Sequence, residues 1–204
     1  FETEFLDEDY DTLGGMLIKL QGKLPEIEEI INFWFKESKP KQWFKKNKFF
    51  DQVIEDRFSC AFEDAIEGKL DNWEESEIGC IALIIILDQF TRNMFRGTPR
   101  AFLGDKRALE LSQKCCDKDY LKNSDVHKRR FMLMPMMHSE DLAVQNAALP
   151  FFKKYTSEKD FEYAKKHREI IAKFGRFPHR NMIIGRKSTY EEIEFLKKAG
   201  SSFR

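Results

Sequence analysis

Charged side chains recur at helical spacing at the end of the most apolar stretch of the sequence. Asp88, Arg92 and Arg96 follow one another at intervals of four residues. In a helix they would share one face, and Asp88 would be able to pair with Arg92. Residues 78–87, just before them, carry no charge, which predicts a buried helix. Charged side chains on such a helix must be paired with opposite charges or take part in a function. They therefore form either a structural ion pair or part of a polar binding site.

A second group of candidates lies where a predicted helix ends and the next begins. His138 comes directly before Ser139, Glu140 and Asp141. Ser139 is the expected N-cap, and both carboxylates fit the first turn, where they interact with the helix dipole. His138 either packs in the loop or lines a pocket. A pocket histidine would serve as acid, base or ligand, because imidazole titrates near neutral pH.

The third group occupies a loop rich in Gly and Pro. It contains Arg176, His179, Arg180 and Asn181, and His167 precedes it in the predicted helix. Guanidinium groups on a rigid loop favour binding of an anion. Arginines in this position also cap the exposed carbonyl groups at a helix C-terminus. Both interpretations remain open.

These residues lack the spacings of the common metal and nucleophile sites. His138, His167 and His179 occur in neither a His-x-x-x-His nor a His-Glu-x-x-His pattern. Ser139 and Ser188 are better explained as helix caps than as nucleophiles. A glycine-rich phosphate loop is also missing from the sequence. We therefore predict no metal and no cofactor, and any catalysis would use His138 or His179 as acid or base.

The overall composition limits the classes of partner. Lys and Arg together number 35, as do Asp and Glu, so the formal net charge is zero. This balance argues against a dedicated nucleic-acid binder and against a polybasic membrane anchor. The longest apolar stretch, 78–87, is about half the length that a membrane span needs. The four cysteines have neither zinc-site nor redox-motif spacing, which predicts reduced thiols and a cytoplasmic protein.

Residues 1–24 differ from the rest of the chain. An acidic stretch leads to Gly14-Gly15 and then to the apolar run 16–20, a pattern typical of a turn entering a strand. The segment 9–25 resembles the end of the transporter-associated domain of CorC/HlyC-type proteins. Because so short a fragment lacks partner strands, we expect residues 1–24 to be an appendage, such as a fusion remnant.

From Pro25 onward the apolar periodicity predicts only helices. Capping residues and glycines mark most of their ends. The predicted helices cover residues 25–35, 47–66, 77–94, 100–116, 126–137, 139–154, 157–174 and 188–200. The short connections favour about eight helices in antiparallel pairs, stacked as a bundle or a short superhelix. The predicted fold class is therefore all-α, with residues 25–204 as a single domain.

Several motifs in this region resemble one family, known as domain of unknown function 924 (DUF924). The resemblance covers residues 26–204 and implies a tetratricopeptide-like, all-helical fold with a shared set of polar residues, but no activity. The matching stretches are Asn32-Phe33-Trp34-Phe35, Leu87-Asp88-Gln89-Phe90, Arg92-Asn93, Phe95-Arg96-Gly97, Met134-Pro135, Met137-His138-Ser139-Glu140-Asp141-Leu142, Gln145, Phe174-Gly175-Arg176-Phe177-Pro178-His179-Arg180-Asn181, Gly185-Arg186 and Ser188-Thr189.

Two functional hypotheses follow from the sequence. In the leading one, the three groups line a pocket for a small anionic molecule. Its wall would consist of Asp88, Arg92, Arg96, His138, Glu140, His167, Arg176, His179, Arg180 and Asn181. In the alternative, the protein is a tetratricopeptide-like scaffold for a protein or peptide partner, and the polar residues are internal ion pairs. Convergence on one open cavity would favour the pocket, and closed ion pairs would favour the scaffold.

Overall fold

The computed structural model describes residues 26–122 and 124–198, and this part of the chain is built from helices without a strand. The predicted appendage and its strand lie outside the described residues. The predicted all-helical fold is confirmed. In chain order the elements are α2 (Ile27–Asn32), η1 (Phe33–Glu37), α3 (Pro40–Trp43), α4 (Lys48–Ile66), η2 (Asp71–Glu75), α5 (Glu77–Ile84), η3 (Ile85–Phe90), α6 (Thr91–Met94), η4 (Pro99–Phe102), α7 (Asp105–Asp117), η5 (Tyr120–Lys122), α8 (Val126–His138), α9 (Leu142–Tyr155), α10 (Glu158–Phe174), η6 (Pro178–Arg180) and α11 (Tyr190–Leu196).

The predicted central helix, 77–94, is one continuous helical segment with a widened middle. It begins as α5, passes through the π-helical stretch η3 and ends as α6, and the residues at both junctions keep right-handed helical dihedral angles. Every residue from Gly79 to Thr91 is buried. The segment packs against α2, α4, α7 and α8, so it is the centre of the fold.

Aromatic rings fill the core around this helix. Phe90 stacks on Phe58 with ring centroids 4.7 Å apart, and Trp34 meets the edge of Phe90 at 5.6 Å. Phe131 of α8 lies 5.5 Å from Trp34 in a second edge contact. Offset and edge-to-face contacts of this kind add to the stabilisation from burial. They tie η1, α4 and α8 to the central helix.

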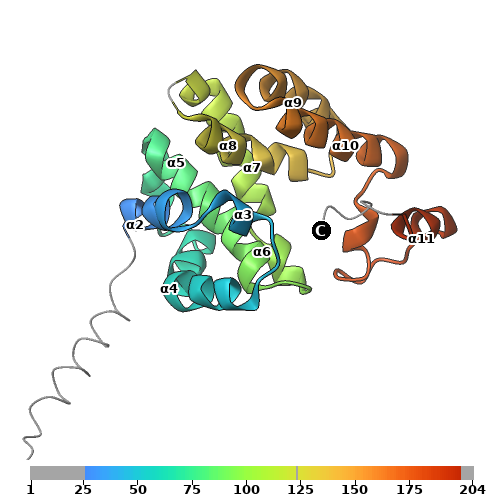
Figure 1. Cartoon of the computed structure of the whole chain (residues 1–204), viewed down its shortest axis with the longest axis horizontal. Helices are drawn as coiled ribbons and strands as arrows, with labels where there is room; N and C mark the ends of the chain where they lie inside the picture. The colour runs from blue at the N-terminus through green and yellow to red at the C-terminus, as the bar shows by residue number, and fades with distance from the viewer. Residues whose placement is uncertain (1–25, 123, 199–204) are drawn as a thin grey trace, which may run out of the picture.

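The later helices form a stack in which α7 packs on α8, α8 on α9 and α9 on α10 (Figure 1). Their ends are fixed locally. Ser157 caps α10 in a capping box with Asp160, and Gly175, with φ of +67°, terminates it, so the helix agrees with the predicted range 157–174. The cap of α9 was predicted wrongly: Asp141 accepts the hydrogen bond from the Ala143 N–H, so the helix begins after it rather than after Ser139.

The chain ends in a small unit beside α10. Figure 1 shows α11 set apart from the first helices, beyond the end of α10. A second apolar cluster holds it there, made of Ile170, Ile171 and Phe177 with Phe174 and Phe195 packed against them. The cap of α11 is Thr189 with Glu192, one residue later than the predicted Ser188. None of the described helices is long and apolar enough to cross a membrane.

Candidate functional site

Asp88 lies in the π-helical stretch of the central helix and is completely buried. The π geometry interrupts the regular backbone ladder, and side chains take up carbonyl groups on its inner side. Thr91 Oγ1 donates to the Leu87 carbonyl at 3.0 Å, and Arg92 Nη1 donates to the Asp88 carbonyl at 2.7 Å. Short π segments inside α-helices occur frequently at functional sites. The local fold therefore places a carboxylate at an irregular point of the core.

The Asp88 carboxylate holds the imidazole of His138, which ends α8. Its Oδ1 lies 2.7 Å from His138 Nδ1 and 3.0 Å from Arg92 Nη1, and Gln89 Nε2 donates to Oδ2 at 2.5 Å. Burial alone would raise the pKa of Asp88, but the charge of Arg92 and the contact with His138 outweigh it and lower that pKa below its ordinary value. Asp88 is therefore an anion, and it requires a proton on His138 Nδ1.

His138 is neutral at neutral pH. Burial lowers its pKa below the ordinary histidine value, and the nearby Asp88 charge opposes this shift only in part. With the proton on Nδ1, the Nε2 atom carries a lone pair. Nε2 makes no hydrogen bond to any residue in the described ranges, and the side chain is 16% exposed. The pair of Asp88 and His138, which we call the dyad, thus offers one unused hydrogen-bond acceptor, His138 Nε2, beside buried charges.

Asp105 joins two guanidinium groups next to the dyad. Its Oδ1 lies 2.9 Å from Arg92 Nη2, and its Oδ2 lies 3.2 Å from Arg180 Nη1. Gly104 allows Asp105 to come this close, because any other residue at position 104 would place its Cβ 2.3 Å from the Leu87 carbonyl oxygen. The first turn of α7 can therefore lie directly against the π-helical stretch only because residue 104 has no side chain.

Arg180 connects the C-terminal unit to this cluster. Its guanidinium carbon lies 4.8 Å from the ring centroid of Phe102 and 4.8 Å from that of Phe177, and its Nη2 donates to the His138 carbonyl at 2.9 Å. Burial and the neighbouring charge of Arg92 lower the pKa of Arg180, but a guanidinium keeps its proton in proteins. We call Asp88, Arg92, Asp105, His138 and Arg180 the inner cluster.

The inner cluster is electrically balanced. Two carboxylates face two guanidinium groups, and the imidazole between them is neutral. It is not a bare positive surface of the kind that attracts any anion. An added negative charge would be unbalanced unless a proton arrived with it. His138 is the group in the cluster that can accept that proton near neutral pH.

Two further predicted histidines lie beside the inner cluster. The centroid of the His167 ring lies 6.2 Å from that of His138 and 5.7 Å from that of Phe177. The His179 ring also lies near Phe177, with centroids 5.6 Å apart. His167 Nδ1 donates to the Tyr163 carbonyl at 2.7 Å. Burial, aided by the charge of His138, lowers the pKa of His167 to about 3. His167 therefore stays neutral at ordinary pH and shapes the site instead of exchanging protons.

Glu140 forms a clamp with Arg186 adjacent to these rings. The two side chains make a bidentate pair at 2.6 and 2.9 Å, and Glu140 Oε1 also accepts the Phe177 N–H at 2.8 Å. Burial would raise the pKa of Glu140, but the hydrogen bonds from Arg186 and Phe177 lower it. This pair fixes the loop that carries Arg180 and His179 against the start of α9.

Three more of the predicted residues lie outside the inner cluster, as His167, His179 and Glu140 do. Arg176 pairs with Glu192 at 2.7 and 2.8 Å, and Asn181 donates to the same carboxylate at 3.2 Å. Arg96 lies beyond the end of α6 and pairs with Asp51 of α4 at 2.6 Å. The predicted common face of the central helix therefore includes Asp88 and Arg92 but not Arg96. All three form closed hydrogen-bonded contacts within the protein.

Three residues of this arrangement are not among those predicted from the sequence: Asp105, Arg186 and Glu192. Asp105 and Glu192 each have a local explanation, since carboxylates in the first turn of a helix are common. Arg186 was noticed only within the family motif. The missing signal is pairing across the fold: Asp105 and Arg180 are 75 residues apart in sequence, and nothing in their spacing connects them. Among the described residues, no group of three or more His, Cys, Asp or Glu side chains is arranged to hold a metal ion.

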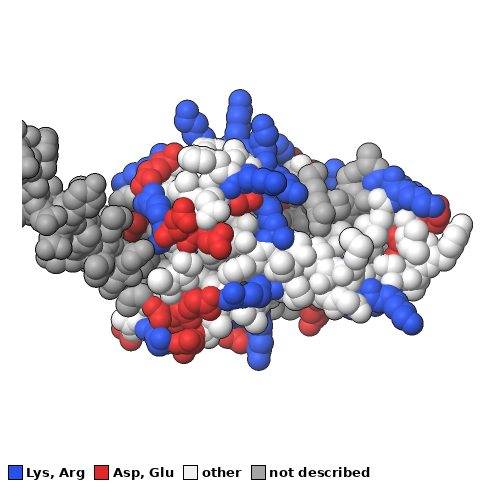
Figure 2. Space-filling model, turned by 90° about the horizontal axis from the view of Figure 1, so that it is seen from below, with Lys and Arg blue, Asp and Glu red and all other residues white. Residues whose placement is uncertain are grey.

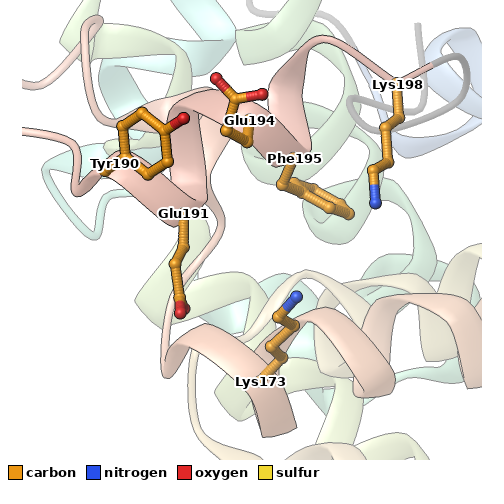
Figure 3. A pocket seen from close by; sticks show the side chains of 6 residues that line it. All are labelled: Lys173, Tyr190, Glu191, Glu194, Phe195 and Lys198. Atoms are coloured by element: carbon orange, nitrogen blue, oxygen red, sulfur yellow. The ribbon is translucent and has the colours of Figure 1, made fainter.

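A surface groove lies away from the inner cluster, between the end of α10 and α11. It encloses about 200 Å³ and is lined by Lys173, Tyr190, Glu191, Glu194, Phe195 and Lys198. Figure 3 shows Lys173 of α10 facing the side chains of α11 across the groove. None of these residues was a candidate from the sequence. None of them belongs to the inner cluster either, so the groove and the inner cluster are separate features.

Comparisons with known proteins place the chain in a family. The model of a family described as "Bacterial protein of unknown function (DUF924)" matches residues 30–200. A comparison with curated proteins gives no match. Among solved structures, a protein of unknown function from Agrobacterium tumefaciens is similar, with 35% sequence identity and a TM-score of 0.80 over 84% of this chain and 96% of that one. The chain therefore belongs to the DUF924 family.

Proposed function

We propose that the helical domain binds a small acid as its anion at His138, next to Arg92 and Arg180. The observation that carries this proposal is the Asp88–His138 dyad. A fully buried carboxylate holds Nδ1, while Nε2 has no partner among the described residues. A carboxylate that orients an imidazole in this way is how proteins prepare a histidine to accept a proton. We also propose that residues 25–204 form a single domain, that its helices stack in a tetratricopeptide-like manner, and that the protein is located in the cytoplasm.

Charge balance specifies the ligand more closely. The inner cluster is neutral before binding, so an anion that arrives alone adds an unbalanced charge to a poorly solvated site. An anion that arrives with one proton leaves an imidazolium between Asp88 and the ligand, and the balance is restored. Arg180 supports binding further, since its buried Nε–H has no acceptor in the described part of the chain.

The proposal predicts that binding and protonation are linked. The pKa of His138 is lowered in the free protein, and a bound anion would raise it. Affinity should therefore increase as the pH falls towards the pKa of His138. The increase should approach about tenfold per pH unit, because one proton is taken up for each anion bound.

Thermal shift measurements with acetate, benzoate, malonate and inorganic phosphate test this, at about pH 6 and about pH 8 on either side of the histidine range. His138→Asn keeps a donor for Asp88 and removes the Nε2 acceptor, so it should abolish the ligand-induced shift. Arg96→Gln removes a more exposed ion pair outside the cluster and should keep the ligand-induced shift. The proposal fails if none of the four probes stabilises the protein, or if His138→Asn responds as the unmodified protein does.

A scaffold for a protein or peptide partner is the second candidate. Its support is that Glu140–Arg186, Arg176–Glu192 and Arg96–Asp51 are closed pairs within the protein. Such pairs suit a rigid framework better than a ligand site. This candidate predicts that the closed pairs matter for stability alone and that the four probe anions leave the melting temperature unchanged.

A further inference from the structure

A run of lysines begins within η1 and continues through α3 to the first residue of α4. Between residues 36 and 48 the chain has six lysines, no arginine and a single acidic residue, Glu37. All six lysine side chains are exposed. They are Lys36, Lys39, Lys41, Lys45, Lys46 and Lys48. We call this stretch the lysine segment.

The charge of the lysine segment is not neutralised by its neighbours. Its one carboxylate, Glu37, pairs with Arg57 of α4 at 2.7 Å. Within the described residues none of the six lysines forms an ion pair, whereas lysines elsewhere, such as Lys69 and Lys165, do. Figure 2 shows basic side chains projecting together along the upper edge of the molecule. A strongly positive surface therefore exists in a chain whose net charge is zero.

Two exposed phenylalanines accompany these lysines. Phe44 is 58% exposed and Phe49 is 78% exposed. Beneath them Trp43 is buried and donates from Nε1 to the Trp34 carbonyl at 2.9 Å, which anchors the turn. One face of the Phe44 ring is stacked on Phe131, with centroids 6.2 Å apart. Aromatic side chains are thus held outward on a rigid support, in the middle of unpaired positive charge.

We propose that the lysine segment binds the surface of a membrane that contains anionic lipids. Phenylalanines that project among lysines match the boundary between headgroups and acyl chains, where the rings insert and the ammonium groups remain with the phosphates. Each lysine near an anionic surface strengthens attachment about fivefold. The composition favours lipid over nucleic acid, since the segment lacks the arginines that bind phosphates and bases bidentately, and one face of Phe44 is already covered.

Co-sedimentation of the full chain with vesicles tests the proposal. Vesicles of phosphatidylcholine with phosphatidylserine should bind the protein, vesicles of phosphatidylcholine alone should not, and added salt should release it. The triple variant Lys45→Gln, Lys46→Gln, Lys48→Gln should lower the partition coefficient by about 100-fold. Phe49→Ser should lower it about tenfold or more, because the ring no longer inserts.

A matched control distinguishes binding through the lysine segment from an effect of the total charge of the protein. The control variant removes three exposed lysines from the end of α7, from α9 and from α10, through Lys118→Gln, Lys153→Gln and Lys159→Gln. It should bind the vesicles as the unmodified chain does. Equal loss in both triple variants would overturn the proposal, as would absence of binding to the phosphatidylserine vesicles. Binding to single-stranded RNA or to polyglutamate, but not to these vesicles, would also overturn it and would identify a different partner.

Discussion

Gly104→Ala is the sharpest test of how the inner cluster is assembled. Gly104 has φ of −84°, a conformation open to any residue, so alanine meets no backbone strain there. Its Cβ would nevertheless lie 2.3 Å from the Leu87 oxygen and 2.9 Å from two further backbone atoms of Leu87. These neighbours are main-chain atoms of the central helix and cannot rotate away. The substitution must therefore push α7 and the π-helical stretch apart.

The size of the effect follows from these contacts. The backbones must separate by about 0.7 Å, the difference between 2.3 Å and the 3.0 Å below which Cβ contacts are essentially never seen. Overpacking of this kind costs about 1–3 kcal/mol. Asp105, the next residue, also loses its contacts with Arg92 and Arg180, and disrupted pairing in a poorly solvated site adds to that cost. We expect the free energy of unfolding to fall by about 2–4 kcal/mol.

Urea unfolding followed by circular dichroism measures this free energy. Gly97→Ala is the matched control, because Gly97 has φ of +76° and open space around its Cβ position. That variant should cost only about 1 kcal/mol, for the strained backbone conformation. If Gly104→Ala destabilises the protein no more than Gly97→Ala, then close approach of α7 does not hold Asp105 in place, and the reasoning is refuted.

Three further predictions concern the surroundings of the cluster. Acidification below about pH 6.5 should destabilise the fold by up to about 1.4 kcal/mol per pH unit, since the unfolded chain protonates His167 while the folded state, with its pKa of about 3, resists. Urea unfolding at several pH values should show that the free energy of unfolding depends less steeply on pH in His167→Gln than in the unmodified protein, and an equal dependence would contradict this. Glu140→Gln should lower the free energy of unfolding by about 1–2 kcal/mol through its weakened hydrogen bonds to Arg186, and an unchanged midpoint in urea would contradict this. Glu192→Gln should speed hydrogen exchange in α11 without shifting the global midpoint, and unaltered exchange would show that this carboxylate does not hold the helix.

Local features of the fold could be predicted from the sequence. The predicted helix 47–66 agrees with α4, whose ends are marked by Asn47 and Gly68, because capping depends on residues within one or two turns. The pairing of Asp88 with Arg92 is equally local. The cap at Asp141 was missed, since Ser139 and Asp141 are both good caps and only packing decides between them.

The assembly of the site could not be predicted in the same way. Asp105 pairs with Arg180, and Glu140 with Arg186, across separations that carry no periodic signal. Net charge says nothing about the distribution of charge, for a related reason. A total of zero is a sum over the whole surface, and it concealed a segment with six unpaired lysines. Pairing and its absence are properties of the folded surface, so composition alone does not contain them.

The π-helical stretch also limits how chains of this fold can change in length. It shifts backbone pairing from i+4 to i+5, so it holds a residue that an α-helix would not need. Deletion of one residue from 85–90 would restore an α-helix and leave the residues after it facing as before, whereas deletion of one residue from α5 would turn everything after it by about 100°. Arg92 would then face away from Asp105. Loss of one residue should therefore be tolerated in the π-helical stretch, whereas α5 must keep its length residue for residue.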